Sequence, residues 1–212
     1  MTRFCIAAAL LAIGSAATLD AVAQKRELVV ATSQSDAGNL DPHQAAAGAD
    51  KGILNWMFNG LVRIRPGQSN PEFIEADLAE SWTSNAPGTV WTFKIRSGVE
   101  CHHGYGPFTA HDAAYSLQRS ADKARSAFAG DFTALEKAEA SDPNTLVVTF
   151  KTRIPSVLGL LSNYHGGLMV CRKAAEEMGA GFGKKPIGTG PFMFDQYQAQ
   201  QHVRMIANPK YF

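Results

Sequence analysis

The 212-residue sequence has little cysteine, no excess of either charge and no internal repeat. Three cysteines are too few for the disulfide framework that replaces a large core in small secreted proteins. Lysine and arginine number 20 and aspartate and glutamate 19, so no general field favours nucleic acid or an acidic membrane. The chain is long enough to bury a sizeable core. We therefore expect a globular protein with no nucleic-acid partner.

Motifs of common enzymes are missing as well. The sequence has no G-x-S-x-G elbow to hold a nucleophilic serine and no H-E-x-x-H pair to hold zinc. The glycine-rich segment 179–185 fails the phosphate-loop pattern, because Met178 replaces its first glycine and Lys185 its final serine or threonine. We expect a surface loop over 181–186.

One cluster does suggest metal or thiol chemistry. Cys101, His102 and His103 are consecutive, and thiolate and imidazole ligands suit zinc, copper or nickel. Three adjacent residues cannot all converge on one ion from an extended chain, and the usual spacing between ligands is absent. We predict no metal site, but an exported metal- or cysteine-dependent enzyme using Cys101, His102, His103 or Cys171 stays open as an alternative function.

The N-terminus has the pattern of an export signal. Arg3 precedes an apolar or small-residue stretch over 4–17, and Ala21-Val22-Ala23 supplies a small-x-small cleavage site. We predict a signal peptide over 1–23, a mature chain from about Gln24 and a periplasmic location. The mature chain keeps Cys101 and Cys171, and an oxidising compartment permits a disulfide between them without requiring one.

Hydrophobic periodicity predicts an alternation of strands and helices. The expected strands are 27–32, 62–65, 78–82, 90–95, 135–140, 145–150, 168–170, 192–197 and 202–207, and the expected helices are 50–61, 110–120, 156–161 and 172–178. The central run of strands is antiparallel in character, with a turn at 142–144 between two of them. We expect one lobe with two subdomains and no linker.

The segment 91–119 is the most informative part of the chain. Its strand alternates apolar and polar residues, its turn is rich in glycine, and Thr109 and Asp112 are placed to cap the helix that follows. The residues that form its pattern are Trp91, Phe93, Arg96, Gly98, His102, Gly104, Pro107, Phe108, Thr109, Asp112 and Arg119.

This pattern resembles the signature region of family 5 extracytoplasmic solute-binding proteins, the oligopeptide, dipeptide and nickel receptors of ABC importers. Further family landmarks occur in the expected order at 39–43 (NLDPH), 59–62 (NGLV), 78–82 (LAESW), 187–192 (IGTGPF) and 208–212 (NPKYF). The resemblance implies a turn-stabilising role for His102. It also implies a structural turn at Gly188, Thr189, Gly190 and Pro191. His103 departs from the usual Asp or Asn.

The resemblance implies an α/β fold: the N-terminal lobe of a two-lobed class II (type C) periplasmic-binding-protein fold. Its mixed sheet would carry an inserted antiparallel-strand subdomain. Family members are more than twice this length, so the expected domain, 24–212, is an incomplete lobe and the second lobe is missing. A non-functional fragment is therefore a further alternative.

The implied function is capture of a small solute, most often a peptide, in a cleft between lobes, and delivery to a permease with ATPase subunits. No enzyme activity, cofactor or metal is implied. The cleft-facing candidates by family position are Ser33, Gln34, Ser35, Asn163, Tyr164 and His165. Tyr164 would give an apolar wall with a hydroxyl, and Asn163 could pair with an amide.

Overall fold

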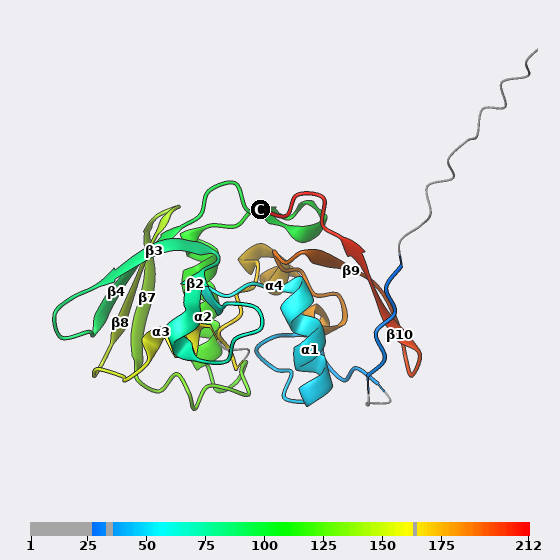
Figure 1. Ribbon diagram of the computed structural model, residues 1–212, viewed down its shortest axis with the longest axis horizontal. Helices are drawn as coiled ribbons and strands as arrows, with labels where there is room; N and C mark the ends of the chain where they lie inside the picture. Colours follow the sequence, from blue (N-terminus) through cyan, green and yellow to red (C-terminus); the bar gives the residue numbers. More distant parts are fainter. Residues whose placement is uncertain (1–26, 33–35, 163–164) are drawn as a thin grey trace, which may run out of the picture. The chain divides into compact units, whose positions relative to one another are not determined.

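A computed structural model of the chain describes residues 27–32, 36–162 and 165–212 (Figure 1). The predicted signal segment 1–23 lies outside these residues. The chain divides into two compact units, 1–31 and 32–212. Within the first unit, the described residues 27–31 form no strand, and Leu28, Val29 and Val30 are exposed. The predicted strand 27–32 is therefore wrong for this structure. Its composition favours a strand, but propensity alone does not decide whether a strand forms.

The second unit begins with a helix whose apolar stripe enters the core. Helix α1 (Gly48–Met57) buries Leu54 and Met57 completely. The predicted helix 50–61 ends four residues early, because Phe58 is already extended. Strand β1 (Val62–Ile64) follows and pairs with β2 (Ile74–Ala76), which comes directly after a 3-10 turn (Pro71–Phe73). Strand β2 was not predicted, since three residues are too few to show a period.

The largest sheet of the described residues has four strands in the order β3-β4-β8-β7, all paired antiparallel. Its members are β3 (Ala79–Ser84), β4 (Val90–Ile95), β7 (Leu135–Asp142) and β8 (Thr145–Phe150). Apolar side chains of β4 and β8 alternate into the core, among them Phe93, Leu146 and Val148. Helix α2 (Ala110–Ala121) lies beside β7 and β8 (Figure 1). This is the predicted antiparallel subdomain.

The remaining elements are short turns, strands and helices, followed by the C-terminal hairpin of β9 and β10. They are β5 (Glu100–Cys101), a 3-10 turn (His102–Gly104), β6 (Gly106–Pro107), α3 (Val157–Leu161), α4 (Arg172–Met178), a 3-10 helix (Gly179–Lys184), β9 (Phe192–Gln198) and β10 (His202–Ala207). The strands predicted at 135–140, 145–150, 192–197 and 202–207 are confirmed and form two hairpins, and the helices predicted at 110–120 and 172–178 are confirmed. The predicted strand 168–170 is reduced to one bridge between Gly60 and Leu168. The predicted loop 181–186 lies mostly in the 3-10 helix.

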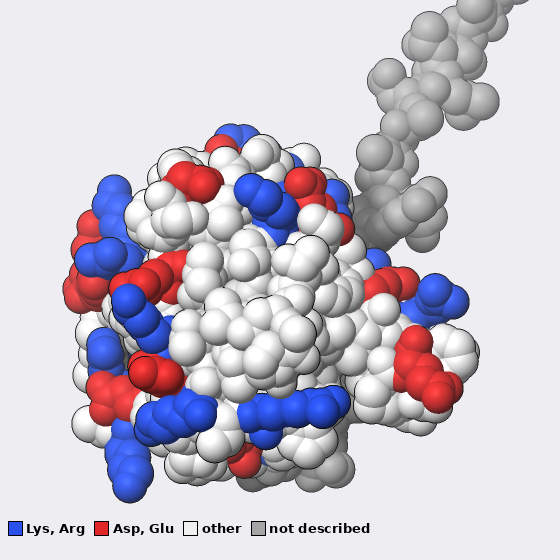
Figure 2. Space-filling model, turned by 90° about the vertical axis from the view of Figure 1, so that its left-hand side faces the viewer, with Lys and Arg blue, Asp and Glu red and all other residues white. Residues whose placement is uncertain are grey.

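The observed architecture is mixed α/β, as expected. Every strand pair in the described part of the chain is antiparallel. On the side of the molecule that carries β4 and β8, basic and acidic side chains surround an uncharged middle (Figure 2). Among the described residues, no helix has the length and apolar character needed to cross a membrane.

Candidate functional site

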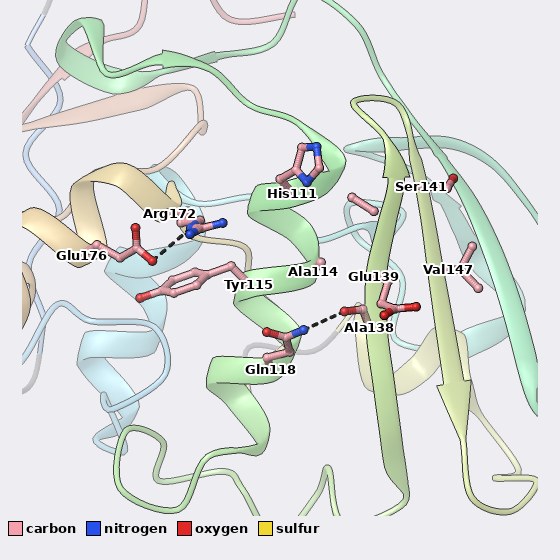
Figure 3. Close-up of a pocket in the computed structure, with 11 residues that line it drawn as sticks. His111, Ala114, Tyr115, Gln118, Ala138, Glu139, Ser141, Val147, Arg172 and Glu176 are labelled. Atoms are coloured by element: carbon pink, nitrogen blue, oxygen red, sulfur yellow. Dashed lines mark hydrogen bonds and ion pairs between the residues drawn. The ribbon is translucent and has the colours of Figure 1, made fainter.

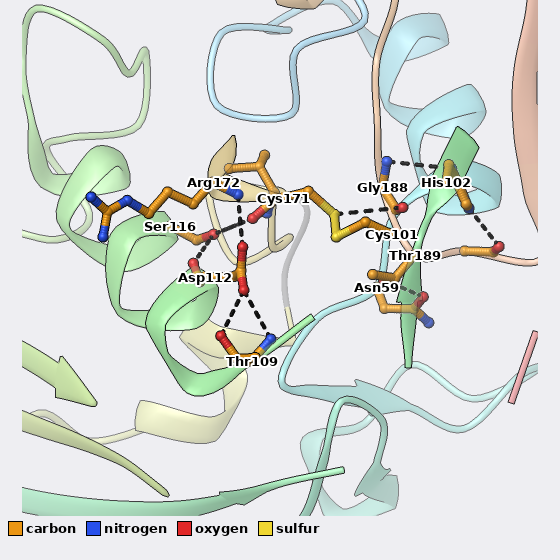
Figure 4. Close-up of a disulfide and its surroundings, with 12 residues drawn as sticks. Asn59, Cys101, His102, Thr109, Asp112, Ser116, Cys171, Arg172, Gly188 and Thr189 are labelled. Carbon is orange, nitrogen blue, oxygen red and sulfur yellow. Dashed lines mark hydrogen bonds between the residues drawn. A yellow bond between two sulfur atoms is a disulfide. The ribbon is translucent and has the colours of Figure 1, made fainter. Parts of the chain in front are cut away.

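The turn at 101–104 and the turn at 188–191 are held together by one histidine (Figure 4). The backbone N–H of His102 donates to the carbonyl oxygen of Gly188 at 2.9 Å. The N–H of Gly188 donates to Nδ1 of His102 at 3.3 Å, so Nε2 carries the proton and donates to the carbonyl oxygen of Gly190 at 2.9 Å. Burial lowers the pKa of His102 to about 4. The ring is therefore a neutral connector between two backbone turns.

His103 makes a separate connection from the same turn. Its φ is 55°, in the left-handed region that Asn and Asp tolerate better than most residues. Its Nε2 donates to the carbonyl oxygen of Phe194 at 2.8 Å, which ties the turn to β9. The departure from the usual Asp or Asn thus adds a contact with the C-terminal hairpin.

Gly188 and Gly190 are required by close packing rather than by a positive φ. A Cβ on Gly188 would lie 2.1 Å from the carbonyl oxygen of Met57, and one on Gly190 would lie 2.6 Å from that of Trp56. The N–H of Gly190 donates to Met57 at 2.9 Å, so the turn satisfies the C-terminal end of α1. Pro191 continues this connection, since its carbonyl oxygen accepts from the N–H of Asn208 at 2.8 Å.

Between these glycines, the side chain of Thr189 belongs to a buried network of hydrogen-bonded polar residues. Its hydroxyl donates to Oδ1 of Asn59 at 3.0 Å, and Nδ2 of Asn59 donates to Oδ1 of Asp77 at 2.8 Å. The N–H of Gly60 donates to the other oxygen of Asp77 at 3.2 Å. Burial raises the pKa of Asp77 to about 6, against the opposing effect of Arg63 and these donors. Segments 59–62, 77–82 and 188–191 therefore meet at one point.

The two mature cysteines form a disulfide, which settles the pairing that the sequence left open. Cys101 at the end of β5 joins Cys171 at the start of α4, across 70 residues (Figure 4). Asp112 acts beside it: one carboxylate oxygen accepts from the N–H of Thr109 at 2.9 Å and the other from the N–H of Arg172 at 2.9 Å. The first turns of α2 and α4 are thus joined through Asp112.

A buried ion pair fastens the 39–43 segment to α2. Nη1 and Nη2 of Arg119 donate to the two carboxylate oxygens of Asp41 at 2.8 and 2.5 Å, and both side chains are almost fully buried. His43 lies beside this pair, and its Nε2–H donates to the carbonyl oxygen of Leu168 at 2.9 Å. Burial, with the Arg119 charge, lowers the pKa of His43 to about 4.

The other predicted signature residues contribute packing and turns. Phe93 and Phe108 are buried, Gly98 and Gly104 have φ of 78° and 77°, and Pro107 pairs with Glu100. Nε1–H of Trp91 donates to the carbonyl oxygen of Gly88 at 3.1 Å, and Nε–H of Arg96 to that of Asp77 at 3.2 Å. All of these residues touch the protein's own backbone or core.

The predicted ligand residues Ser33, Gln34, Ser35, Asn163 and Tyr164 lie outside the described residues. Next to the first group, Asp36 accepts from the Tyr197 hydroxyl at 2.6 Å and from the N–H of Gln200 at 3.1 Å. These contacts attach Asp36 to the β9–β10 hairpin.

His165, the remaining candidate, lies in a cluster that the sequence did not indicate. Its Nε2 is 2.9 Å from Nζ of Lys51 in α1, and its ring stacks on Phe128 with centroids 5.1 Å apart. Neither Lys51 nor Phe128 stands in a recognisable motif, so no sequence signal could have grouped them. We refer to Lys51, Phe128 and His165 as the lysine–histidine cluster.

A separate open groove of about 680 Å³ lies between α2, α4 and β7 (Figure 3). Its polar side chains are largely engaged: Gln118 donates to the carbonyl oxygen of Ala138 at 2.8 Å, and Arg172 pairs with Glu176 at 3.0 Å. His165, the predicted ligand residue that the structure describes, does not line it. The groove is therefore not our candidate solute site.

Comparisons with known proteins agree on one family. Residues 74–212 match the model of bacterial extracellular solute-binding proteins, family 5. Di/tripeptide-binding protein 2 of Pseudomonas aeruginosa is 29% identical over 95% of this chain and 41% of its own length. Relatives of this kind are solute-binding proteins rather than enzymes.

Solved structures give the same result. The solute-binding protein MoaA of A. tumefaciens R10, in complex with mannopinic acid, is 46% identical with a TM-score of 0.82, over 84% of this chain and 36% of that one. The periplasmic binding protein DppA of Helicobacter pylori, in complex with the peptide STSA, is 26% identical with a TM-score of 0.74, over 84% and 38%. The chain thus spans less than half the length of the proteins it matches.

Proposed function

The chain belongs to family 5 of the bacterial extracellular solute-binding proteins, and from this premise we propose that it captures a small solute for an ABC importer. The family match over residues 74–212 carries the proposal. The contacts between the landmark segments support it, because the residues that resemble the family are those that hold this lobe together. The proposed mechanism is capture without chemistry: a lobe of this kind forms one wall of a cleft, and closure encloses the solute.

The proposed location follows from the N-terminal sequence. Residues 1–23 would direct export to the periplasm and be removed near Ala23. An oxidising compartment agrees with the Cys101–Cys171 disulfide. The permease and its ATPase subunits would be the partners, and the ATP site would belong to them.

The alternative enzyme use of residues 101–103 loses support from the geometry. The Cys101 sulfur is bonded to that of Cys171, and Nδ1 of His102 accepts the N–H of Gly188. Neither atom is then available as a nucleophile or a metal ligand.

For the solute, a small peptide is the first candidate, because one relative is named for di- and tripeptides and one neighbour holds the peptide STSA. An amino-acid conjugate of the mannopinic acid type is the second. The observation that favours it is the 46% identity to a protein holding that compound, well above the 29% and 26% of the peptide-binding comparisons. Both solute types carry a carboxylate.

The test is a binding titration of the exported protein. The full coding sequence is expressed in a Gram-negative host, and the chain is purified from the periplasmic fraction, with an expected N-terminus at Gln24 by mass spectrometry. Calorimetric titration with dialanine, trialanine and mannopinic acid should give saturable binding to at least one, and mannitol should give none. Absence of saturable binding to all three would reject the proposal, and turnover of a bound solute, followed by NMR, would favour an enzyme.

A further inference from the structure

An open groove follows the outer edge of strand β7. This strand is the last of the four-stranded sheet, so one of its two sides has no neighbouring strand in that sheet. The groove of about 680 Å³ between α2, α4 and β7 contacts residues 138–141 of the strand, and a smaller groove of about 340 Å³ continues along residues 135–138. Gln118 and Ala138 line both of them (Figure 3). The two grooves together follow almost the whole of β7.

Backbone hydrogen bonds at the end of β8 show which way its peptide groups point. The N–H of Phe150 donates to the carbonyl oxygen of Thr89, on the β4 side, at 2.8 Å. The N–H of the next residue, Lys151, donates to that of Ala134, on the β7 side, at 2.9 Å. Because the direction alternates from one residue to the next along a strand, the peptide groups of residues 147 and 149 point toward β7.

The register of the two strands then gives the direction of the peptide groups of β7. Residues 147 and 149 lie opposite Glu139 and Lys137, whose N–H and C=O groups are therefore used inside the sheet. Those of Ala138 and Ala140 point outward, toward the groove that both residues line. Gln118 agrees with this direction, since its Nε2–H donates to the carbonyl oxygen of Ala138 at 2.8 Å. Among the described residues, no side chain donates in the same way to Ala140.

Small side chains leave room beside this edge. Ala114 of α2 faces the groove together with Ala138 and Ala140 of β7, and the Tyr115 ring adds an apolar surface. Glu139 points to the other face of the strand, where its exposed carboxylate pairs with Lys137 at 2.7 Å. An exposed pair of this kind contributes little net free energy, so Glu139 can exchange Lys137 for another cation at little cost.

The charges of the groove indicate what kind of segment would fit it. Carboxylates outnumber cations among the lining side chains, which include Asp122, Glu136, Glu139 and Glu176 against Lys137 and Arg172. An extended chain placed along β7 would alternate its side chains between the two faces of the sheet. Basic side chains would pair with Glu139 on one face, and apolar side chains would contact Tyr115 and the alanines on the other.

We propose that the outer edge of β7 is a docking site for an extended segment of a partner polypeptide in which basic and apolar residues alternate. The segment would add to the sheet as a fifth strand, with backbone hydrogen bonds to Ala140 supplying affinity and the groove side chains supplying specificity. It would also replace the Gln118 amide on Ala138, which exchanges one hydrogen bond for another. A second copy of this chain fits less well, because its own β7 would bring further glutamates to the same groove. The proposal concerns a polypeptide partner and does not rest on the proposed function.

The test uses the full chain labelled with ¹⁵N and a synthetic peptide of alternating lysine and valine, acetylated and amidated at its ends. Titration followed by ¹H–¹⁵N NMR should give saturable shifts at residues 138–141, and hydrogen exchange of the Ala140 amide should slow in the complex. The same peptide with every amide N-methylated keeps its charge but cannot complete a strand. It should bind at least about 10-fold more weakly.

Two substitutions test the site itself. Ala140→Pro removes the outward N–H and is compatible with an edge strand, so it should abolish peptide binding and leave the circular dichroism spectrum unchanged. Glu139→Lys replaces attraction by repulsion and should weaken binding roughly 3- to 10-fold. Glu80→Lys makes the same change on β3, at the opposite edge of the sheet, and should bind the peptide as the unchanged chain does.

Three results would overturn the proposal: no saturable binding of the unmethylated peptide, equal binding of the methylated peptide, and equal effects of Glu139→Lys and Glu80→Lys. Analytical ultracentrifugation without peptide tests the other occupant. A dimer of the unchanged chain that Ala140→Pro dissociates would show that β7 receives a second copy, and the proposed partner segment would then be rejected.

Discussion

Among the described residues, Asp41 and Arg119 form the most deeply buried ion pair. Both charges are nearly removed from water, where desolvation is expensive, and they are compensated by two parallel hydrogen bonds at 2.8 and 2.5 Å. The Arg119 guanidinium also lies 5.9 Å from the centre of the Phe182 ring. Such a pair fixes where segment 39–43 sits on α2 rather than adding much net stability.

Arg119→Met should therefore destabilise the chain severely. It leaves the Asp41 carboxylate buried without its partner, which costs about 3–5 kcal/mol in comparable sites. Urea denaturation followed by circular dichroism gives the free energy of unfolding. The control is Arg125→Met, which removes an exposed partner of Asp122 and should change stability little. Equal effects of the two substitutions would contradict the interpretation.

Sequence reasoning selected both of these residues without relating them. Asp41 and Arg119 stand in landmark segments, but they are 78 residues apart and nothing local pairs them. The same holds for His102: its role in a turn could be expected, whereas its bonds to Gly188 and Gly190 could not. Local patterns predict what a residue does to its own turn. They do not predict which distant backbone completes its hydrogen bonds.

At the scale of elements, the disulfide joins the β5–β6 turn to α4. Cys101 precedes His102, which holds 188–190, and Cys171 precedes the residue bonded to Asp112. One covalent link thus connects the helix pair α2 and α4 to the turn against the end of α1. Helix α4 has seven residues, too short to be stable alone, so such external attachment matters.

Replacing both cysteines should weaken the fold without changing its architecture. For a separation of 70 residues, loss of the crosslink costs about 4 kcal/mol in the chain-entropy model. Cys101→Ala with Cys171→Ala should lower the free energy of unfolding by that amount relative to the oxidised chain, and the urea midpoint should fall with it. Adding dithiothreitol should lower the midpoint of the oxidised chain and leave the double variant unaffected. An unchanged midpoint in the double variant would show that the disulfide does not contribute to the stability of the fold.

The elements themselves were largely predictable, and the exceptions have physical causes. The capped helix α2 and both long hairpins follow from period, turn residues and caps over six or more residues. Short β2 gave no such signal. Segment 27–32 gave a strong signal and forms no strand in this structure, because a short apolar run does not by itself decide between strand and loop. Of the predicted solute residues, only His165 can be placed, and its neighbours Lys51 and Phe128 came from packing alone.

At the scale of the whole molecule, two buried histidines and one buried aspartate have opposite effects on the pH dependence of stability. His43 and His102 have pKa values near 4 in the folded chain, below the ordinary 6.5, because burial disfavours their charged forms. Between pH 4 and 6.5 these two histidines are protonated in the unfolded chain but neutral in the folded chain. The free energy of unfolding therefore falls as the pH is lowered. Asp77 has a pKa of about 6, above its ordinary 3.8. Between these two values the folded chain keeps the Asp77 proton that the unfolded chain has lost, so Asp77 makes the fold more stable as the pH falls through this range.

The opposing effects of these groups predict how steeply the free energy of unfolding changes with pH, and Asp77→Asn should double that slope. At pH 5 each histidine raises the free energy of unfolding by about 1 kcal/mol per pH unit, and Asp77 lowers it by about the same amount. The net slope of the unchanged chain is then about that of one histidine, and Asp77→Asn should leave the slope of two. Urea denaturation between pH 4.5 and 6.5 measures this slope independently of any constant loss of stability caused by the substitution. Glu80→Gln, an exposed carboxylate on β3, is the control and should keep the slope of the unchanged chain. A slope for Asp77→Asn that equals the control would mean that Asp77 is ionised throughout this range, and that Arg63 and the donors around it outweigh its burial.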